Sequence, residues 1–153
     1  MPDFTVNLTW NQDKEGTLTA RSNPPLAVAT PPAFGGPEGR WAPEELLVAS
    51  VGACVMSTLL YFAERFDVPL AAYTSVSKGS LDKTPGGLRF TGVDVAIQVT
   101  VPDAEAQQRA VPLRLKEKLE QYCPVSSSLA CPVRVTLDLR SGTGGEASPA
   151  GSD

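Results

Sequence analysis

The feature that most constrains the fold is the stretch at residues 41–66, WAPEELLVASVGACVMSTLLYFAERF. Its apolar residues recur at intervals of three and four, which is the period of one face of an α-helix. Pro43 suits a first helical position, where its missing N–H loses no partner, and Glu44 and Glu45 place carboxylates near the positive end of the helix dipole. We therefore expect a long, mostly buried helix that begins at this proline.

Cys54 lies in the middle of this predicted helix, and small residues surround it. They are Ala49, Ser50, Gly52, Ala53 and Ser57. Small side chains allow another backbone to approach the thiol closely. Two interpretations stay open, because most buried cysteines are simply small core residues and only some are reactive thiols.

The composition indicates one folded domain. A chain of 153 residues with 42% hydrophobic content can bury a sizeable core. We expect a single domain at residues 1–140, and a disordered tail at residues 141–153 because that segment is rich in Gly, Ser, Ala and Pro. The net charge of −4, without a cluster of Lys and Arg, argues against nucleic acid or an anionic membrane as a partner.

The sequence also suggests a location. We find no apolar run that approaches the roughly 20 residues of a membrane span. The N-terminus, MPDFTVNLTW, lacks the basic start and the small-residue cleavage site of a signal peptide. We expect a cytoplasmic protein.

The chain has three cysteines and no histidine. An odd number of cysteines in a reducing compartment favours thiol chemistry or core packing over a disulfide framework. The absence of histidine removes His-based metal sites and nucleophile–His pairs. The cysteine spacings do not match a zinc motif either, so we expect no metal site.

Alternation of apolar and polar residues predicts two groups of strands. Residues 4–10 and 17–21 should form a hairpin across a turn at residues 11–16, and residues 26–30 should add a third strand. A Pro- and Gly-rich loop at residues 31–41 then leads into the long helix. Beyond that helix, three further strands are expected, with Gly79 as a candidate bulge; they lie at residues 73–81, 88–101 and 133–139.

A second helical region is expected at residues 104–122. Asp103 is a good N-cap, and Pro112 must split or kink the helix. Cys123 and Pro124 then begin a short turn or helix, whose positive end would favour a thiolate at Cys123. The alternative is that Cys123 only closes a helix against the core, and we interpret Cys131 as structural.

The segments PEELLVASVGAC and YCPVSSSL, separated by a long strand hairpin, together resemble the OsmC/Ohr family of osmotically inducible and organic hydroperoxide resistance proteins. The resemblance runs from the first strand to Leu139. It implies an α+β fold in which a curled, mostly antiparallel sheet surrounds two central helices. It also implies an intertwined homodimer with its active sites at the interface.

The resemblance also implies roles for particular residues. In a thiol peroxidase of this family Cys54 would be the peroxidatic thiol, Cys123 the resolving thiol and Glu44 an active-site carboxylate. The family arginine that holds the thiolate is replaced, since the matching turn QDKEG offers Lys14 and the position used by the other branch is Phe34. The implied partners are an organic hydroperoxide and a dithiol reductant, with no cofactor, nucleic acid or membrane.

Three functional hypotheses remain at this stage. The first is the peroxidase, the second is an OsmC-like protein that binds a small apolar or electrophilic ligand, and the third is a structural module with core cysteines. For the peroxidase, helix geometry separates Glu44 from Cys54 by about 15 Å along one helix. Either Glu44 precedes the helix and folds back, or it reaches Cys54 of the partner subunit. Besides Lys14, the cations available near the helix entry are Arg21 and Arg40.

Overall fold

The computed structural model describes residues 1–142. The chain divides into two compact units, Met1–Leu47 and a second that begins at Val48, and each is described here by itself. The predicted tail lies outside the described residues from residue 143 onward. Its first residue, Ser141, still belongs to the last strand.

The first unit is a three-stranded antiparallel sheet, ordered β1-β2-β3. The strands are β1 (Asn7–Gln12), β2 (Glu15–Thr19) and β3 (Leu26–Ala29), and a short 3-10 turn, η1 (Pro32–Phe34), follows. The predicted hairpin is confirmed, but its turn is shorter than residues 11–16. Gln12 pairs directly with Glu15, and Asp13 takes a positive φ of 45° to close the turn.

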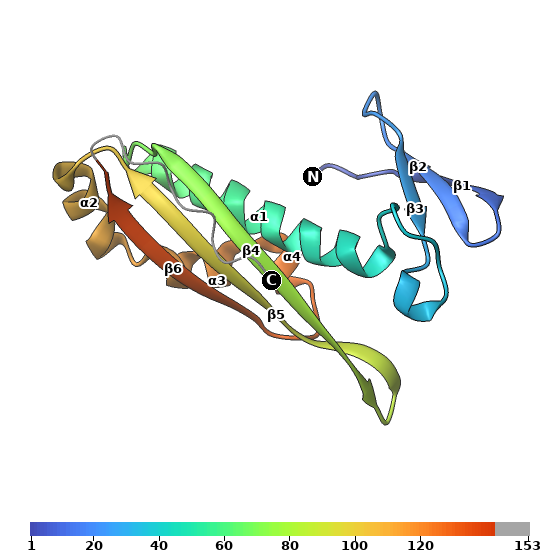
Figure 1. The fold of residues 1–153 in the computed structure, drawn as a ribbon. Helices are drawn as coiled ribbons and strands as arrows, with labels where there is room; N and C mark the ends of the chain where they lie inside the picture. Colours follow the sequence, from blue (N-terminus) through green and yellow to red (C-terminus); the bar gives the residue numbers. More distant parts are fainter. Residues whose placement is uncertain (143–153) are drawn as a thin grey trace. The chain divides into compact units, whose positions relative to one another are not determined.

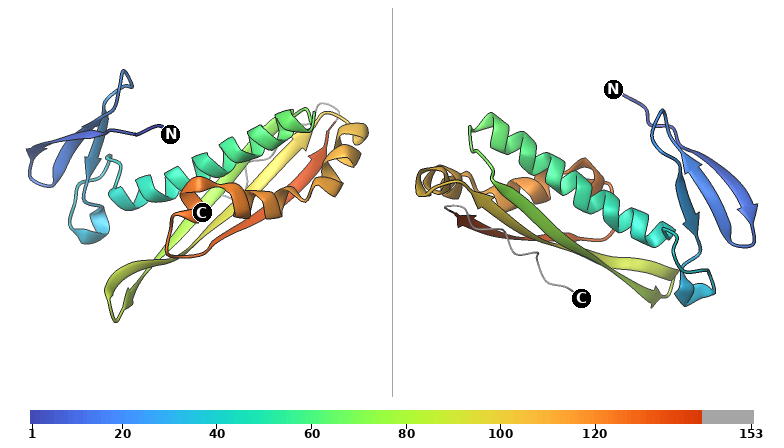
Figure 2. Two further views of the ribbon diagram at one scale, coloured as in Figure 1. Left: turned by 180° about the vertical axis from the view of Figure 1, so that it is seen from behind. Right: turned by 45° about the horizontal axis from the view of Figure 1, so that its top comes forward.

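The second unit contains the other sheet, ordered β4-β5-β6, with helices on one of its faces (Figures 1 and 2). Its strands are β4 (Ala72–Thr84), β5 (Gly87–Val101) and β6 (Val133–Ser141). β4 pairs with β5 in antiparallel fashion, whereas β6 runs parallel to β5. The α+β class and the mostly antiparallel pairing are thus confirmed, with the strands divided between two sheets.

The long helix α1 (Pro43–Arg65) begins at the predicted proline. The carboxylate of Glu45 accepts a hydrogen bond from the backbone N–H of Ala42 at 2.9 Å, which satisfies a free donor at the helix start. Its buried positions lie at intervals of three, four and one, which is a single face; they are Val51, Val55, Leu59, Phe62 and Ala63.

The expectation that α1 is mostly buried is wrong for the single chain. Met56, Leu60 and Tyr61 are 37%, 44% and 58% exposed. A sheet can cover only one face of a helix, and the described part of the second unit supplies no layer for the opposite face of α1. Within this unit an apolar helix face therefore remains uncovered.

Glycines allow the second unit to pack closely. A Cβ on Gly52 of α1 would lie 2.6 Å from the Ser77 hydroxyl of β4, and a Cβ on Gly79 would lie 2.5 Å from a methyl of Val48. Gly79 is therefore explained by close approach to the helix. The strand irregularity expected at Gly79 lies between Ser80 and Leu81 instead.

The second helical region is split as predicted, into α2 (Ala104–Ala110), η2 (Val111–Leu113) and α3 (Leu115–Tyr122). Asp103 caps α2, because its carboxylate accepts the Ala106 N–H at 2.8 Å. A single helical turn, α4 (Pro124–Ser127), follows directly after Cys123.

By length and composition alone, α1 could cross a membrane, which the sequence analysis did not anticipate. It has 23 residues, and its most apolar window has a mean hydropathy of 2.0. Of the residues in that window, 33% are buried. This is weak evidence, because the core helix of a soluble protein passes the same test.

Candidate functional site

The structure brings two of the predicted site residues, Cys54 and Cys123, into contact. Cys54 projects from the middle of α1, and Cys123 lies between α3 and α4. Both thiols are free, and each contributes to the pKa shift of the other, so the two side chains interact. Two thiols this close can form a disulfide after oxidation of either one.

The two thiols differ in access. Cys123 is 0% exposed, whereas Cys54 is partly exposed and lines a pocket of about 480 Å³. The wall of this pocket is mostly aromatic and hydroxyl-bearing; beside Cys54 it consists of Ser57, Thr58, Tyr61, Phe62, Lys118, Tyr122 and Pro124. A small molecule entering the pocket therefore meets Cys54.

The surroundings of the two thiols shift their pKa values in opposite directions. Burial, followed by the hydrogen bond with Cys123, raises the pKa of Cys54. Burial alone would raise the pKa of Cys123 too. The Cys54 thiol, the Ser126 hydroxyl and the backbone N–H groups of Ser126 and Val125 outweigh it, so the pKa of Cys123 is lowered. The opposite directions of the two shifts favour ionisation at Cys123 over Cys54.

Lys118 is a pocket residue that sequence reasoning missed. It stands among charged residues of α3, a pattern typical of a solvent-facing helix surface, but Lys118 lines the pocket with Cys54. Its ammonium donates a hydrogen bond to the Leu113 carbonyl and lies 5.8 Å from the centre of the Phe66 ring. The signal was available, because Lys118 is four residues before Tyr122 and shares its helix face.

In the first unit Lys14 lies beside Phe34, the position that matches the arginine of the other branch. The Lys14 ammonium donates a hydrogen bond to the Phe34 carbonyl at 3.1 Å, and a Cβ on Gly35 would lie 2.8 Å from it. Among the described residues Lys14 forms no ion pair. Lys14 thus places its charge beside the loop position where the other branch of the family carries its arginine.

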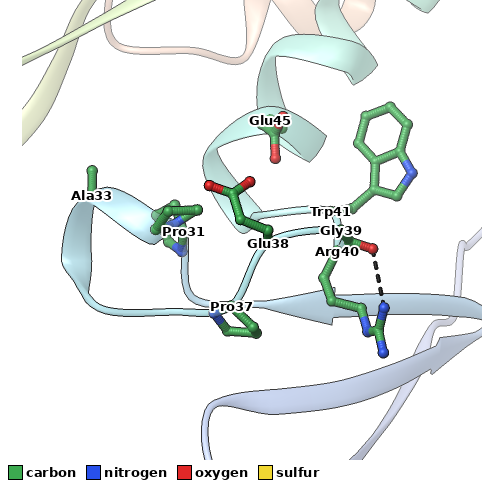
Figure 3. Close-up of a pocket in the computed structure, with 9 residues that line it drawn as sticks. Pro31, Ala33, Pro37, Glu38, Gly39, Arg40, Trp41 and Glu45 are labelled. Carbon is green, nitrogen blue, oxygen red and sulfur yellow. Dashed lines mark hydrogen bonds between the residues drawn. The ribbon is translucent and has the colours of Figure 1, made fainter.

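Arg40 has partners of its own in the first unit. Its guanidinium lies 3.2 Å from the Glu15 carboxylate and donates to the Gly39 carbonyl at 3.1 Å. It lines a pocket of about 450 Å³ that Trp41 and the carboxylates of Glu38 and Glu45 also line (Figure 3). Arg40 is therefore a paired loop charge, whereas Lys14 is not paired.

Glu44 lies in the first turn of α1. The alternative in which it precedes the helix and folds back is therefore wrong. One carboxylate oxygen of Glu44, Oε2, is buried without a hydrogen-bond partner among the described residues. A buried carboxylate oxygen without a donor is costly, so this position is suited to receive a cation.

The remaining candidates contribute less. Cys131 is partly exposed and outside the Cys54 pocket. Within residues 1–142 no group of three or more His, Cys, Asp and Glu side chains is placed to hold a metal ion. Arg21 has a positive φ of 51° and forms no ion pair in this part of the chain.

Comparison with known proteins places this site in context. A relative from Acinetobacter baylyi, the uncharacterized protein ACIAD3023, is 23% identical over 139 residues, which cover 89% of this chain and 92% of the relative. An OsmC-like protein of unknown function from Vibrio cholerae superposes with a TM-score of 0.80 at 19% identity, covering 90% of this chain and 99% of the other.

A structure from Legionella pneumophila, described as an organic hydroperoxide resistance protein OsmC, superposes with a TM-score of 0.68 at 24% identity, covering 92% of this chain and 98% of the other. These similarities show that the fold is OsmC-like. The family profile "OsmC-like protein" matches residues 36–138, which include both Cys54 and Cys123. The chain belongs to the OsmC-like protein family.

Proposed function

We propose that this protein is a thiol-dependent peroxidase that reduces organic hydroperoxides. The observation that carries the proposal is the contact between two free thiols, of which one lines an open pocket and the other is buried. The family also includes proteins named for organic hydroperoxide resistance. Exposure supports Cys54 as the peroxidatic thiol and Cys123 as the resolving thiol, because, of these two, only Cys54 lines the pocket.

The chemistry needs only the two thiols and an external reductant. The Cys54 thiolate attacks the terminal peroxide oxygen, the O–O bond breaks, and the departing alkoxide takes a proton to become an alcohol. The resulting Cys54 sulfenic acid is attacked by the Cys123 thiolate, which forms the disulfide and releases hydroxide, protonated to water. A dithiol then reduces the disulfide by exchange and is itself oxidised.

The proposal requires a cation near Cys54, because burial and the Cys123 contact raise the pKa of Cys54. We assign this role to Lys14, since it forms no ion pair whereas Arg40 is bound to Glu15. The unpartnered oxygen of Glu44 would hold the ammonium in place.

We further propose that the site is completed in a homodimer. The exposed apolar face of α1 includes Met56 and Leu60, and a second copy of the chain would bury it. Helix geometry keeps Glu44 about 15 Å from Cys54 of the same α1, so the carboxylate would serve the partner subunit's Cys54. With thiols as its working groups, the protein would act in the reducing cytoplasm.

A second candidate function is the binding of a small apolar or electrophilic molecule without turnover. The aromatic wall of the pocket and the raised pKa of Cys54 favour it, because a protonated thiol is a poor nucleophile.

One experiment separates the two candidates. The purified protein is incubated with cumene hydroperoxide and dithiothreitol, and peroxide consumption is followed with Cys54→Ser as the control. Turnover that disappears in the control supports the peroxidase. If there is no turnover, and if bound cumyl alcohol protects Cys54 from alkylation by iodoacetamide, the binding function is supported instead.

A further inference from the structure

Three consecutive serines, at positions 126–128, lie just after Cys123, and the hydroxyls of two of them donate hydrogen bonds to backbone carbonyls. The Ser127 hydroxyl donates to the Cys123 carbonyl at 2.9 Å, and the Ser128 hydroxyl donates to the Pro124 carbonyl at 2.7 Å. Each bond joins a hydroxyl to the carbonyl four residues before it, which is the usual alternative to solvent for a serine in a helical turn.

Ser126 behaves differently. It is 8% exposed, and its hydroxyl oxygen is buried without a hydrogen-bond partner among the described residues. A buried hydroxyl without a partner costs free energy, and such groups in native proteins call for an explanation. Ser126 is three positions after Cys123, so the two share one side of the α4 turn.

The Cys123 sulfur belongs to the same turn and is the candidate partner for the Ser126 hydroxyl. The hydroxyl lies close enough to this sulfur to lower the pKa of Cys123, although it makes no fully formed hydrogen bond in the reduced protein. A neutral thiol is a weak acceptor, whereas a thiolate accepts strong, charge-assisted bonds. The hydroxyl is therefore poised to complete its bond when Cys123 ionises.

We propose that Ser126 is a positioning residue for the second thiol: its hydroxyl donates a hydrogen bond to the Cys123 thiolate and aims that sulfur at Cys54. This rests on the proposed function for its consequence, which is faster closure of the disulfide. In that step the Cys123 thiolate attacks the Cys54 sulfenic sulfur, the S–S bond forms, the S–O bond breaks, and hydroxide leaves to be protonated to water.

The titratable neighbours of Cys123 must be considered in any test. Cys54 faces it from α1, and Lys118 and Tyr122 of α3 line the pocket beside Cys54. The test therefore uses a parent with Cys54→Ser and Cys131→Ser, in which Cys123 is the one remaining thiol and a hydroxyl still stands at position 54.

The thiolate content of Cys123 is then titrated by ultraviolet absorbance, which does not require a reagent to reach a buried sulfur. Ser126→Ala should raise the midpoint by roughly one pH unit, the effect of losing one hydrogen bond to a charged group. Ser126→Thr retains a hydroxyl and should restore the parent midpoint. Ser128→Ala, which removes a hydroxyl bound to the Pro124 carbonyl, is the matched control and should not shift it.

Ser126→Ala should fold at least as stably as the parent, because it removes a buried hydroxyl that lacks a partner. An unchanged midpoint in folded Ser126→Ala, or an equal shift in Ser128→Ala, would overturn the proposal.

A kinetic experiment separates this proposal from the peroxidase hypothesis. In the chain with all three cysteines, one equivalent of cumene hydroperoxide should leave a Cys54 sulfenic acid that persists about tenfold longer in Ser126→Ala, matching the loss of one hydrogen bond to the thiolate. If the unmodified protein forms neither a Cys54 sulfenic acid nor a Cys54–Cys123 disulfide, the peroxidase is refuted, while the titration still decides the role of Ser126.

Discussion

Cys54 and Cys123 are unequal partners because their surroundings are unequal. Burial dominates at Cys54 and raises its pKa, whereas at Cys123 several hydrogen-bond donors outweigh burial and lower the pKa. Loss of the first proton from the pair therefore leaves the charge on the buried sulfur. This suits Cys123 as the thiol that closes the disulfide, and it leaves Cys54 dependent on a cation for attack.

We predict that Cys54→Ser abolishes peroxide consumption, because it removes the thiol that the pocket exposes. Cys123→Ser should permit one turnover and then accumulate a sulfenic acid or a mixed disulfide, detectable by mass spectrometry. Cys131→Ser is the matched control and should have little effect, since Cys131 lies outside the pocket. Normal turnover in Cys54→Ser would show that the assignment is wrong.

The second prediction at this scale concerns Lys14. Removing its charge in Lys14→Met should raise the pKa of Cys54 by roughly one unit, and alkylation of Cys54 by iodoacetamide at neutral pH should slow because less thiolate is present. Lys14→Arg should preserve or improve peroxide turnover, because a guanidinium can bind a carboxylate through two donors.

The control for this prediction is Arg40→Met, whose guanidinium is bound to Glu15. The pH profile of alkylation, with each cysteine resolved by mass spectrometry, is the measurement. If the alkylation profile of Cys54 shifts in Arg40→Met but not in Lys14→Met, the cation that stabilises the Cys54 thiolate is Arg40 and not Lys14.

At the scale of elements, the position of Cys54 depends on how closely α1 packs on β4. Gly52 and Gly79 remove the side chains that would hold the two apart. The close approach of β4 to α1 occurs at Gly52, two positions before Cys54. It therefore helps to fix the position of the Cys54 thiol relative to Cys123.

We predict that Gly79→Ala destabilises the protein by about 1–3 kcal/mol, the usual cost of overpacking. The added methyl would lie 2.5 Å from Val48 and 2.8 Å from the Phe90 ring, both packed apolar groups. Gly92→Ala on the neighbouring strand is the control, because its nearest neighbour is the mobile end of Arg134 at 3.0 Å. Urea unfolding measures both, and equal midpoints would contradict the packing argument.

At the scale of the whole molecule, the open question is what covers the apolar face of α1. The described part of the second unit leaves Met56, Leu60 and Tyr61 exposed on a helix whose opposite face is buried. An exposed apolar face of this kind is characteristic of an interaction surface such as an oligomer interface.

We predict a homodimer that sediments as such at micromolar concentration. Leu60→Asp should shift it toward monomer, because a carboxylate would have to be buried at the interface without a partner. Leu88→Asp, at an exposed apolar position on β5, is the matched control and should leave the dimer intact. A stable monomer for the unmodified protein would remove the shared-site hypothesis.

The sequence by itself determined the local elements. Periodicity predicted α1 and the strands, and short-range chemistry predicted the Asp103 cap and the break at Pro112, because caps and proline effects act within one turn. The paired motifs around Cys54 and Cys123 predicted the family. These are features that depend on residues close in the chain or on a pattern of motifs that a family shares.

Only the tertiary structure decided which side chains meet. It placed Cys54 against Cys123, brought Lys118 into the pocket and left the Ser126 hydroxyl beside a sulfur. It also showed that one sheet covers one face of α1, which corrected the expectation of a mostly buried helix. Burial and thiol pKa depend on groups that are distant in sequence and packed together by the fold, so periodicity and composition could not determine them.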